Sequence, residues 1–396
     1  MKLCAIKLVA LCIGCVAALT LLEMGLRIFN PIEIRIRGDE IVLPTNRKYV
    51  FENSSNLRGI DRTVVHTKNA LGFRGADLPK RGLEHFLSVI AVGGSTTECA
   101  FLSDGKDWPA LIAEYLKNDF GPVWLNNAGL DGFSTFGYTV LLRDMILKLK
   151  PKVLIFLVGA NDMARKEAGE HSASHIKGSI RLDSIEGFVK SASAYSEVAS
   201  VALNSYRYLR ARASGLPHQN LDIVALPHAT YPDPNLPELL EPHIHTFVPA
   251  FEQRLQTIIR LAKDFQIDPV LITQPSLLGR GIDPSTGIDL RTIKFGRTTG
   301  RTYWTTLELY NQATREVGIQ ENVLTIDLAE ELEKDSKLFY DALHFTNTGA
   351  AEVARIIYKH LNPYVMENYG SFRKSRREMS TSIGGANLEG GRPGLE

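Results

Sequence analysis

The feature that most constrains the fold is a repeated unit of apolar strand, glycine turn and helix, which begins near Phe86. Three short apolar runs, each followed by or ending in glycine, are typical of buried strands; they lie at 86–92, 122–129 and 152–158. Segments with helical spacing follow the first two, at 107–120 and 134–149. Because strands joined through helices run parallel, the pattern predicts a parallel sheet covered by helices on both faces.

The same alternation returns in the last third of the chain. Apolar runs predict further strands at 269–273 and 323–327, and helical spacing predicts helices at 251–265, 303–317 and 348–361. The whole pattern therefore predicts a three-layer α/β/α fold of the doubly wound, flavodoxin-like kind, with a five-stranded parallel sheet.

Four further segments surround or interrupt this pattern. Residues 30–85 read as an irregular or β-rich lead-in, and the main domain is expected over 86–365. Within it, an insertion at about 164–250, helical over 185–212, is expected to cover the carboxyl edge of the sheet like a lid. Residues 366–396 are rich in Gly, Ser and Arg without apolar periodicity, which predicts a disordered tail.

Within the first 29 residues, an apolar segment begins after Lys2 and Lys7. No charge interrupts 8–22, and only Glu23 and Arg27 occur before Phe29. The fifteen residues 8–22 fit the core of a signal peptide, whereas a membrane-spanning helix usually needs about 20 apolar residues. Three interpretations stay open: an uncleaved signal anchor, a cleaved signal peptide and a core helix. We expect export, with the domain extracytoplasmic (periplasmic or at the cell surface) and anchored to the membrane, or secreted if the segment is cleaved.

Charge and cysteine content exclude several classes of function. The formal net charge is +1, from 45 basic and 44 acidic residues, which argues against nucleic acid as a partner. Three of the four cysteines lie in the apolar N-terminus, so Cys99 alone cannot build a disulfide framework or a cysteine zinc site. The histidine pairs 171/175 and 243/245 lack a supporting ligand pattern. We therefore expect no metal and no cofactor.

Polar residues gather where the strands end, which is where open parallel sheets bind ligands. Ser95 lies in the first such turn, within Gly-Gly-Ser-Thr-Thr-Glu. This turn alone is compatible with a phosphate cradle, a serine nucleophile or a structural turn. A nucleotide-phosphate loop carries a lysine next to its Ser or Thr, whereas Glu98 here would repel phosphate.

Asp341 and His344 precede the last predicted helix and favour the nucleophile. An imidazole can take the serine proton, and a carboxylate can hold the imidazole and stabilise its charged form. Gly132 and Asn161 also follow strands, and both can donate a hydrogen bond to an oxyanion through a backbone N–H and a side-chain amide, respectively. Singly, each of the four could instead be a cap, a surface histidine or a turn residue.

Together the four segments resemble the Ser-Gly-Asn-His blocks of the SGNH (GDSL-like) hydrolase superfamily, over Val89 to about Leu361. The resemblance implies that Ser95 is the nucleophile, His344 the base and Asp341 its orienting acid. It also implies an oxyanion hole formed by the backbone N–H groups of Ser95 and Gly132 and by the side-chain amide of Asn161. It further implies that Asp162 supports the loop and that no metal is needed.

One position departs from the family pattern: Gly94 stands where these proteins usually carry Asp. The departure removes a supporting contact but no directly catalytic group. The block GGSTTE, the N-terminal anchor and the lead-in sequence NALGFRGAD (69–77) together resemble a membrane-anchored bacterial subset of the family.

The activity expected from this resemblance is hydrolysis of carboxylic (O-acyl) esters through an acyl-enzyme on Ser95. Two alternatives stay open. The same site could transfer the acyl group to a cell-surface glycan, which would make the protein an O-acyltransferase. Alternatively, the chain could be a catalytically silent glycan-binding or assembly protein. The expected partners are an ester or acylated-glycan substrate and the membrane.

Overall fold

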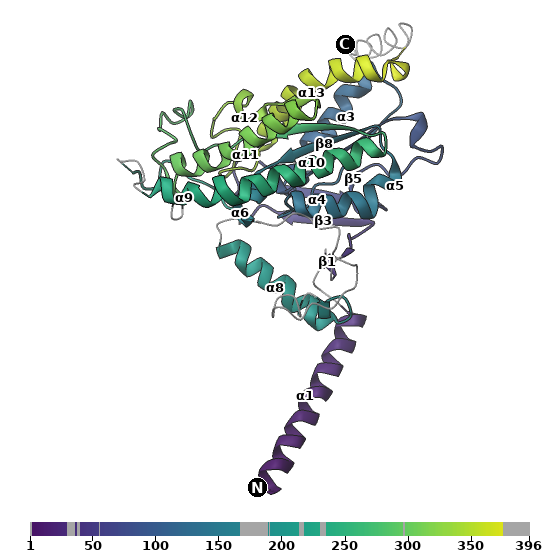
Figure 1. Ribbon diagram of the computed structural model, residues 1–396, viewed down its shortest axis with the longest axis vertical. Helices are drawn as coiled ribbons and strands as arrows, with labels where there is room; N and C mark the ends of the chain where they lie inside the picture. Colours follow the sequence, from purple (N-terminus) through teal and green to yellow (C-terminus); the bar gives the residue numbers. More distant parts are fainter. Residues whose placement is uncertain are drawn as a thin grey trace, which may run out of the picture. The chain divides into compact units, whose positions relative to one another are not determined.

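The computed structural model describes residues 2–29, 36–37, 40–54, 56–166, 189, 191–213, 218–229, 235–295 and 298–374. The chain divides into two compact units, each made of two segments. The first unit comprises Met1–Pro44 and Ser172–Pro217, and the second comprises Thr45–His171 and His218–Glu396. The predicted strand–turn–helix pattern lies in the second unit (Figure 1).

The first unit contains a long N-terminal helix, α1 (Lys2–Ile28), and a second helix, α8 (Glu197–Ala213). Two short strands, β1 (Ile36–Arg37) and β2 (Glu40–Ile41), pair antiparallel. The stretch Val9–Ile28 of α1 has a mean hydropathy of 2.2 and none of it is buried. By length and composition it is apolar enough to cross a membrane.

Glu23 of α1 joins the two helices of this unit. Its carboxylate accepts hydrogen bonds from the backbone N–H groups of Glu197 (3.0 Å) and Val198 (3.1 Å) and from the Ser196 hydroxyl (2.8 Å). A carboxylate at this place satisfies N–H groups that have no partner within α8 and complements the helix dipole. The end of α1 therefore caps the beginning of α8.

The second unit is built on a six-stranded sheet in the order β12-β9-β8-β6-β7-β5. Five strands are parallel: β6 (Leu87–Gly93), β7 (Val123–Asn127), β8 (Val153–Val158), β9 (Asp268–Thr273) and β12 (Thr325–Ile326). Taken in chain order their arrangement is 2-1-3-4-5, so the predicted doubly wound, flavodoxin-like fold is confirmed. The sixth strand, β5 (Arg74–Gly75), pairs antiparallel with β7 and comes from the lead-in, where no sheet strand was predicted.

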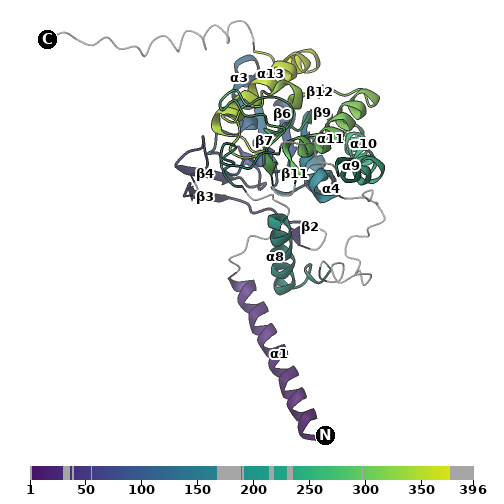
Figure 2. The same ribbon diagram turned by 90° about the vertical axis from the view of Figure 1, so that its left-hand side faces the viewer.

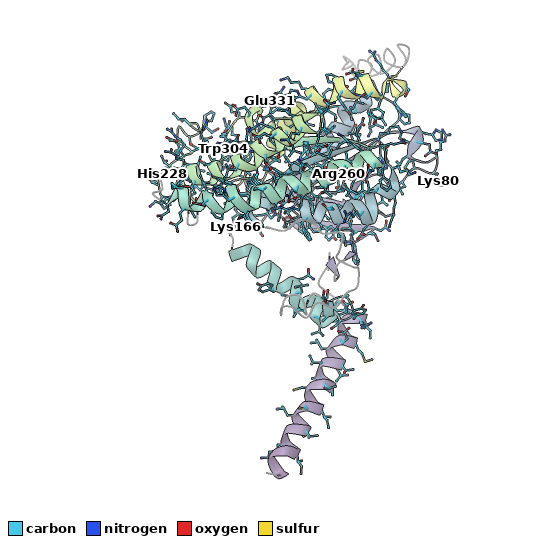
Figure 3. The ribbon with its side chains drawn as sticks, in the orientation of Figure 1. Lys80, Lys166, His228, Arg260, Trp304 and Glu331 are labelled. Atoms are coloured by element: carbon cyan, nitrogen blue, oxygen red, sulfur yellow. The ribbon has the colours of Figure 1, made fainter. Side chains whose placement is uncertain are left out.

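Helices cover both faces of this sheet. On one face α3 (Trp108–Asp119) packs against β7 and against α13 (Asn347–Asn368), and on the other α10 (Val248–Asp264) packs between α4 (Thr135–Leu141) and α11 (Gly300–Gln320) (Figures 1 and 2). Arg260 and Glu331 are charged residues that lie exposed on the outside of this unit (Figure 3). The remaining α-helices among the described residues are α2 (Ser95–Glu98), α5 (Leu147–Leu149), α6 (Ala160–Arg165), α9 (Leu236–Pro242) and α12 (Leu328–Glu331). The remaining described strands pair as β3 (Arg47–Glu52) with β4 (Thr63–Lys68) and as β10 (Lys294–Phe295) with β11 (Thr298–Thr299).

Every residue of β6 and β8 is buried, which is why these strands read as continuous apolar runs rather than as an alternating pattern. Alternate residues of β6, Val89 and Ala91, join the core beneath α3, together with Trp108 and Ile112 of that helix. Among the six strands of this sheet, β6 and β8 are thus the two in which every residue is buried.

The compact units of the structure begin and end at other residues than two of the expected domain boundaries. The lead-in belongs to the sheet-containing unit from Thr45 onward, because β5 adds to the central sheet. At the other end α13 continues to Asn368, and the backbone N–H of Gly121 donates to the Phe372 carbonyl (3.0 Å). Order therefore extends to Lys374, and the rest of the predicted tail, 375–396, lies outside the described residues. Much of the predicted lid, including 167–188, lies outside them as well.

Candidate active site

The turn between β6 and α2 presents Ser95 at the carboxyl end of a central strand. Ser95 is the first residue of α2, and Gly94 is its N-cap. A Cβ added to Gly93 would lie 2.0 Å from Thr97 Oγ1, so the turn closes only with a glycine there. β6 lies between β7 and β8, the place where the strand order reverses. Ser95 therefore stands at the switch point at which doubly wound sheets bind ligands.

The structure brings Ser95, His344 and Asp341 together across 249 residues of sequence. Ser95 Oγ is 2.7 Å from His344 Nε2, and His344 Nδ1 is 2.6 Å from Asp341 Oδ2. The other Asp341 oxygen, Oδ1, accepts the backbone N–H groups of Leu343 (2.8 Å) and His344 (2.7 Å). Both carboxylate oxygens are thus used, and the short turn before α13 fixes the imidazole toward the serine.

Burial and charge oppose each other at this pair. Burial by itself lowers the pKa of His344, but the Asp341 charge and its hydrogen bond outweigh burial, with a smaller contribution from Asp131, so the pKa is raised above its ordinary value of 6.5. The pKa of Asp341 is lowered because the imidazole and the two backbone donors outweigh the effect of burial. The carboxylate therefore favours the protonated imidazole, the state that follows removal of the serine proton.

Gly132 and Asn161 come from the two loops beside Ser95. Gly132 has φ +73°, a backbone conformation that glycine adopts easily and other residues rarely adopt. Two residues earlier, the backbone N–H of Leu130 donates to the Gly93 carbonyl (3.0 Å). Asn161 lies in the first turn of α6, after β8, and its Nδ2 donates to the carbonyl of Phe133 (2.8 Å). The amide thus reaches across to the residue that follows Gly132.

Gly94 lies directly against the Asn161 amide. A Cβ at Gly94 would lie 2.2 Å from Asn161 Nδ2 and 3.3 Å from the Phe133 carbonyl oxygen. Its φ of −86° is not in the left-handed region that favours glycine, so the lack of space beside the Asn161 amide is the reason for glycine that the structure gives here. In this protein the Asn161 amide occupies the space that a side chain at position 94 would need, which accounts for the glycine there.

Asp162 is buried one residue further along and joins two helices. Its carboxylate accepts the backbone N–H of Thr135 (3.2 Å) and pairs with Arg254 of α10 (3.3 Å), and both side chains are almost inaccessible. Thr135 begins α4, only three residues after Gly132. The contacts of Asp162 thus hold the end of the Gly132 loop to α6 and α10.

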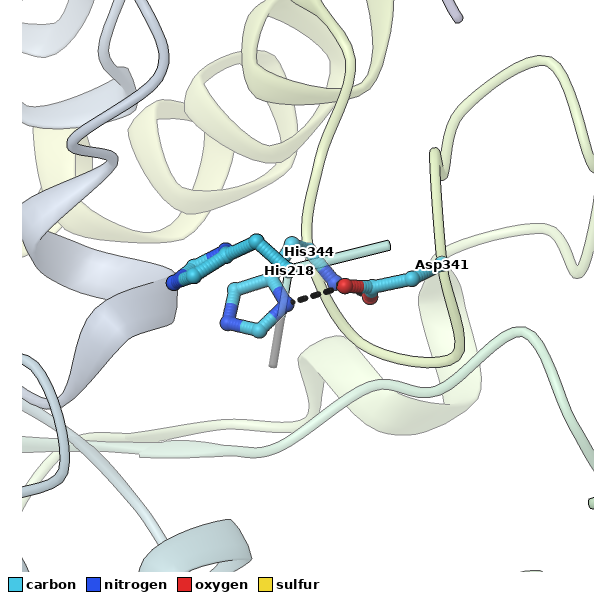
Figure 4. A group of neighbouring side chains, drawn as sticks. All are labelled: His218, Asp341 and His344. Carbon is cyan, nitrogen blue, oxygen red and sulfur yellow. Dashed lines mark hydrogen bonds and ion pairs between the residues drawn. The ribbon is translucent and has the colours of Figure 1, made fainter. Parts of the chain in front are cut away.

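Sequence reasoning missed His218, whose ring lies against that of His344 with centroids 4.1 Å apart, while Asp341 contacts His344 from the other side (Figure 4). His218 Nδ1 is 2.7 Å from the Tyr340 hydroxyl, and Nε2 is 3.9 Å from Asp131 Oδ2. His218 lies in the insertion, where no strand or helix pattern pointed to it, so only the folded chain could reveal it.

His218, Asp341 and His344 each offer a ligand atom within 4.8 Å of the others, as a metal site would require. Asp341 and His344 already bond each other, however, and His344 also bonds Ser95. Of the histidines considered from the sequence, His243 is buried and bonds the Tyr310 hydroxyl (2.8 Å), and His171 and His175 lie outside the described residues. The arrangement suits proton transfer from a serine better than metal ligation.

Comparison with known proteins gives a family. Residues 91–352 match the GDSL-like Lipase/Acylhydrolase family. Solved structures with similarity include Axe2, an acetylxylan esterase from Geobacillus stearothermophilus (14% identity, TM-score 0.40, 72% of this chain and 96% of that one). Another is a putative lipolytic protein of the G-D-S-L family from Desulfitobacterium hafniense DCB-2 (13%, TM-score 0.37, 69% and 98%). No curated protein matches the chain.

Proposed function

Since the chain belongs to the GDSL-like lipase/acylhydrolase family and is a serine ester hydrolase, we propose that Ser95 is its nucleophile, His344 its base and Asp341 the group that orients His344. The observation that carries this proposal is the hydrogen-bonded series Ser95 Oγ–His344 Nε2 (2.7 Å) and His344 Nδ1–Asp341 Oδ2 (2.6 Å). The substrate class we propose is the carboxylic O-acyl ester.

In the first half of the reaction, Ser95 Oγ attacks the acyl carbon while His344 Nε2 takes the hydroxyl proton. The carbonyl oxygen becomes an oxyanion, which accepts hydrogen bonds from the backbone N–H groups of Ser95 and Gly132 and from Asn161 Nδ2. As the tetrahedral intermediate collapses, the C–O bond to the alcohol breaks and His344 gives its proton to the departing oxygen. An acyl-enzyme on Ser95 remains.

In the second half, water loses a proton to His344 and attacks the acyl carbon, and the bond to Ser95 Oγ breaks as that oxygen regains the proton. The carboxylic acid leaves and the free enzyme is restored. Throughout the cycle Asp341 keeps its charge, because its low pKa and its two backbone hydrogen bonds hold it ionised.

The direct test is Ser95→Ala in the full-length chain. The wild-type protein should hydrolyse short-chain aryl esters and become labelled by a fluorophosphonate, and the variant should do neither. Labelling of the variant at another residue would overturn the assignment. A wild-type protein that never reacts with the fluorophosphonate would instead support the catalytically silent alternative.

Transfer to a glycan would use the same acyl-enzyme and differ only in the acceptor. Incubation with an acyl donor and a polysaccharide acceptor, with acylated glycan and free acid both measured, separates the two activities. We propose that water is the acceptor, so free acid should account for nearly all of the donor consumed. Acylated glycan as the main product would replace hydrolysis by transfer.

For location, we propose that α1 is retained as a membrane anchor and that the sheet-containing unit is extracytoplasmic. The support is the apolar stretch Val9–Ile28 after the two N-terminal lysines, together with the contacts of Glu23 with Ser196, Glu197 and Val198. These contacts make α1 part of the folded first unit. Alkaline extraction should leave the protein in membranes with an intact N-terminus, and added protease should digest it in spheroplasts. Release as a shortened chain would contradict retention.

A further inference from the structure

The block GGSTTE ends in Glu98, an acidic residue that the proposed chemistry does not use. Glu98 is the last residue of α2, three positions after Ser95, and its side chain is fully buried. Its Oε1 accepts a hydrogen bond from Lys68 Nζ (3.0 Å), and the Lys68 side chain is only 4% exposed. Because taking two charges out of water is costly, a buried ion pair is seldom explained by stability alone.

The second oxygen of the same carboxylate reaches the loop that carries Gly132. Glu98 Oε2 accepts the backbone N–H of Asp131 at 2.7 Å, and Asp131 directly precedes Gly132. The beginning of this loop rests on α2 itself, since a Cβ at Gly129 would lie 2.2 Å from the backbone nitrogen of Glu98. One carboxylate therefore ties the helix of the nucleophile to the loop of a proposed oxyanion donor.

The lead-in holds Glu98 from a third direction. Arg74 of β5 is buried, and its guanidinium donates to the carbonyls of Glu98 (2.8 Å), Cys99 (2.7 Å) and Leu102 (2.9 Å). Lys68 ends β4, so both cations come from the segment around NALGFRGAD. Two of the three sequence features that resemble the anchored subset, this lead-in and GGSTTE, thus meet at one residue.

We propose that Lys68 and Glu98 are positioning residues that set the place of the Gly132 N–H relative to Ser95. The inference rests on the proposed function, in which Gly132 stabilises the oxyanion. Oxyanion donors act only when they are held close to the developing charge, and a shift of about 1 Å can cost a large part of the rate. Lys68 keeps the carboxylate paired, and the carboxylate in turn keeps the Asp131 N–H and the loop in place.

Two double variants of the full-length chain test this with closely matched volumes and with no charge at either position 68 or position 98. In Lys68→Met/Glu98→Gln, the amide oxygen can still accept the Asp131 N–H, whereas in Lys68→Met/Glu98→Leu nothing can. We expect kcat on an aryl ester to fall about 10- to 100-fold further in the Leu variant than in the Gln variant, with KM little changed, because the lost interaction acts mainly in the transition state.

Activity is normalised to active sites titrated with a fluorophosphonate after prolonged labelling, and folding is checked by thermal unfolding. Lys117→Met/Glu114→Leu, at an exposed ion pair on α3 (2.6 Å), is the matched control and should keep the wild-type kcat. Equal kcat per active site in the Gln and Leu variants would overturn the positioning role. Failure of the proposed function itself would instead appear as activity that survives Ser95→Ala.

If the Leu variant does not fold, Gly129→Ala tests the same contact from the loop side. The added methyl group must separate the loop from α2, so kcat should again fall while KM is kept. An unchanged kcat in folded Gly129→Ala would overturn the proposal.

Discussion

Gly94→Ala is the perturbation that tests most directly how the site is assembled. The new methyl group would lie 2.2 Å from Asn161 Nδ2, whereas ordinary contacts begin near 3.4 Å. The amide must therefore withdraw by about 1.2 Å (3.4 − 2.2) along that line. The substitution meets no left-handed backbone strain, since φ at Gly94 is −86°. The main consequence of the substitution is thus displacement of one proposed oxyanion donor.

The size of the effect follows from that displacement. Loss of one oxyanion donor costs about 10²–10³ in kcat, or about 2.7–4 kcal/mol, and a misplacement of about 1 Å can cost about 10². We expect kcat of Gly94→Ala to fall about 100-fold, near the lower end of this range, because a displaced amide can still contribute at long range. KM should change little, since the interaction is made chiefly in the transition state.

The assay is steady-state hydrolysis of an aryl ester by Gly94→Ala, Asn161→Ala and the double variant. Because both substitutions act through the same amide, the double variant should be no slower than Asn161→Ala alone. Gly370→Ala is the matched control, since a Cβ there meets nothing within 4 Å. A kcat for Gly94→Ala within about threefold of wild type, or a loss that multiplies with that of Asn161→Ala, would refute the reasoning.

Three further predictions follow from the same structure. Because the pKa of His344 is raised, its neutral base form is lost as pH falls, and kcat/KM should decline through a midpoint above 6.5. A pH–rate series of Asp341→Asn should show a lower midpoint and a kcat reduced by about 10⁴. Asp162→Ala leaves Arg254 buried without that carboxylate and should cost about 3–5 kcal/mol in urea unfolding, and a loss under about 1 kcal/mol would contradict the role given to the pair. Burial raises the pKa of the Cys99 thiol, so peptide mapping should find it alkylated by iodoacetamide only after unfolding, and rapid labelling in the native chain would count against it.

What the sequence alone determined was local. The apolar runs of β6 and β8 are continuous because both faces of these strands are buried, and that pattern is visible without a structure. Polar residues that follow such strands meet at one edge of a parallel sheet, which is why Ser95, Gly132 and Asn161 could be grouped by position. Asp341 and His344 are three apart, so their pairing also needed only a single turn.

Only the tertiary structure decided the contacts between segments that no sequence pattern links to each other. β5 is two residues long, too short for any periodicity, and becomes a strand only because β7 offers it an open edge. His218 contacts His344 only because a loop brings it there. The positioning role proposed for Glu98 depends on its hydrogen bonds with Lys68 and Asp131, which lie 30 and 33 residues away in the sequence. Even the absence of a side chain at Gly94 is explained by the Asn161 amide beside it. The periodicity of a sequence indicates which face of a helix or strand is buried. Which residues of other segments pack against that face depends on the three-dimensional packing of the whole chain.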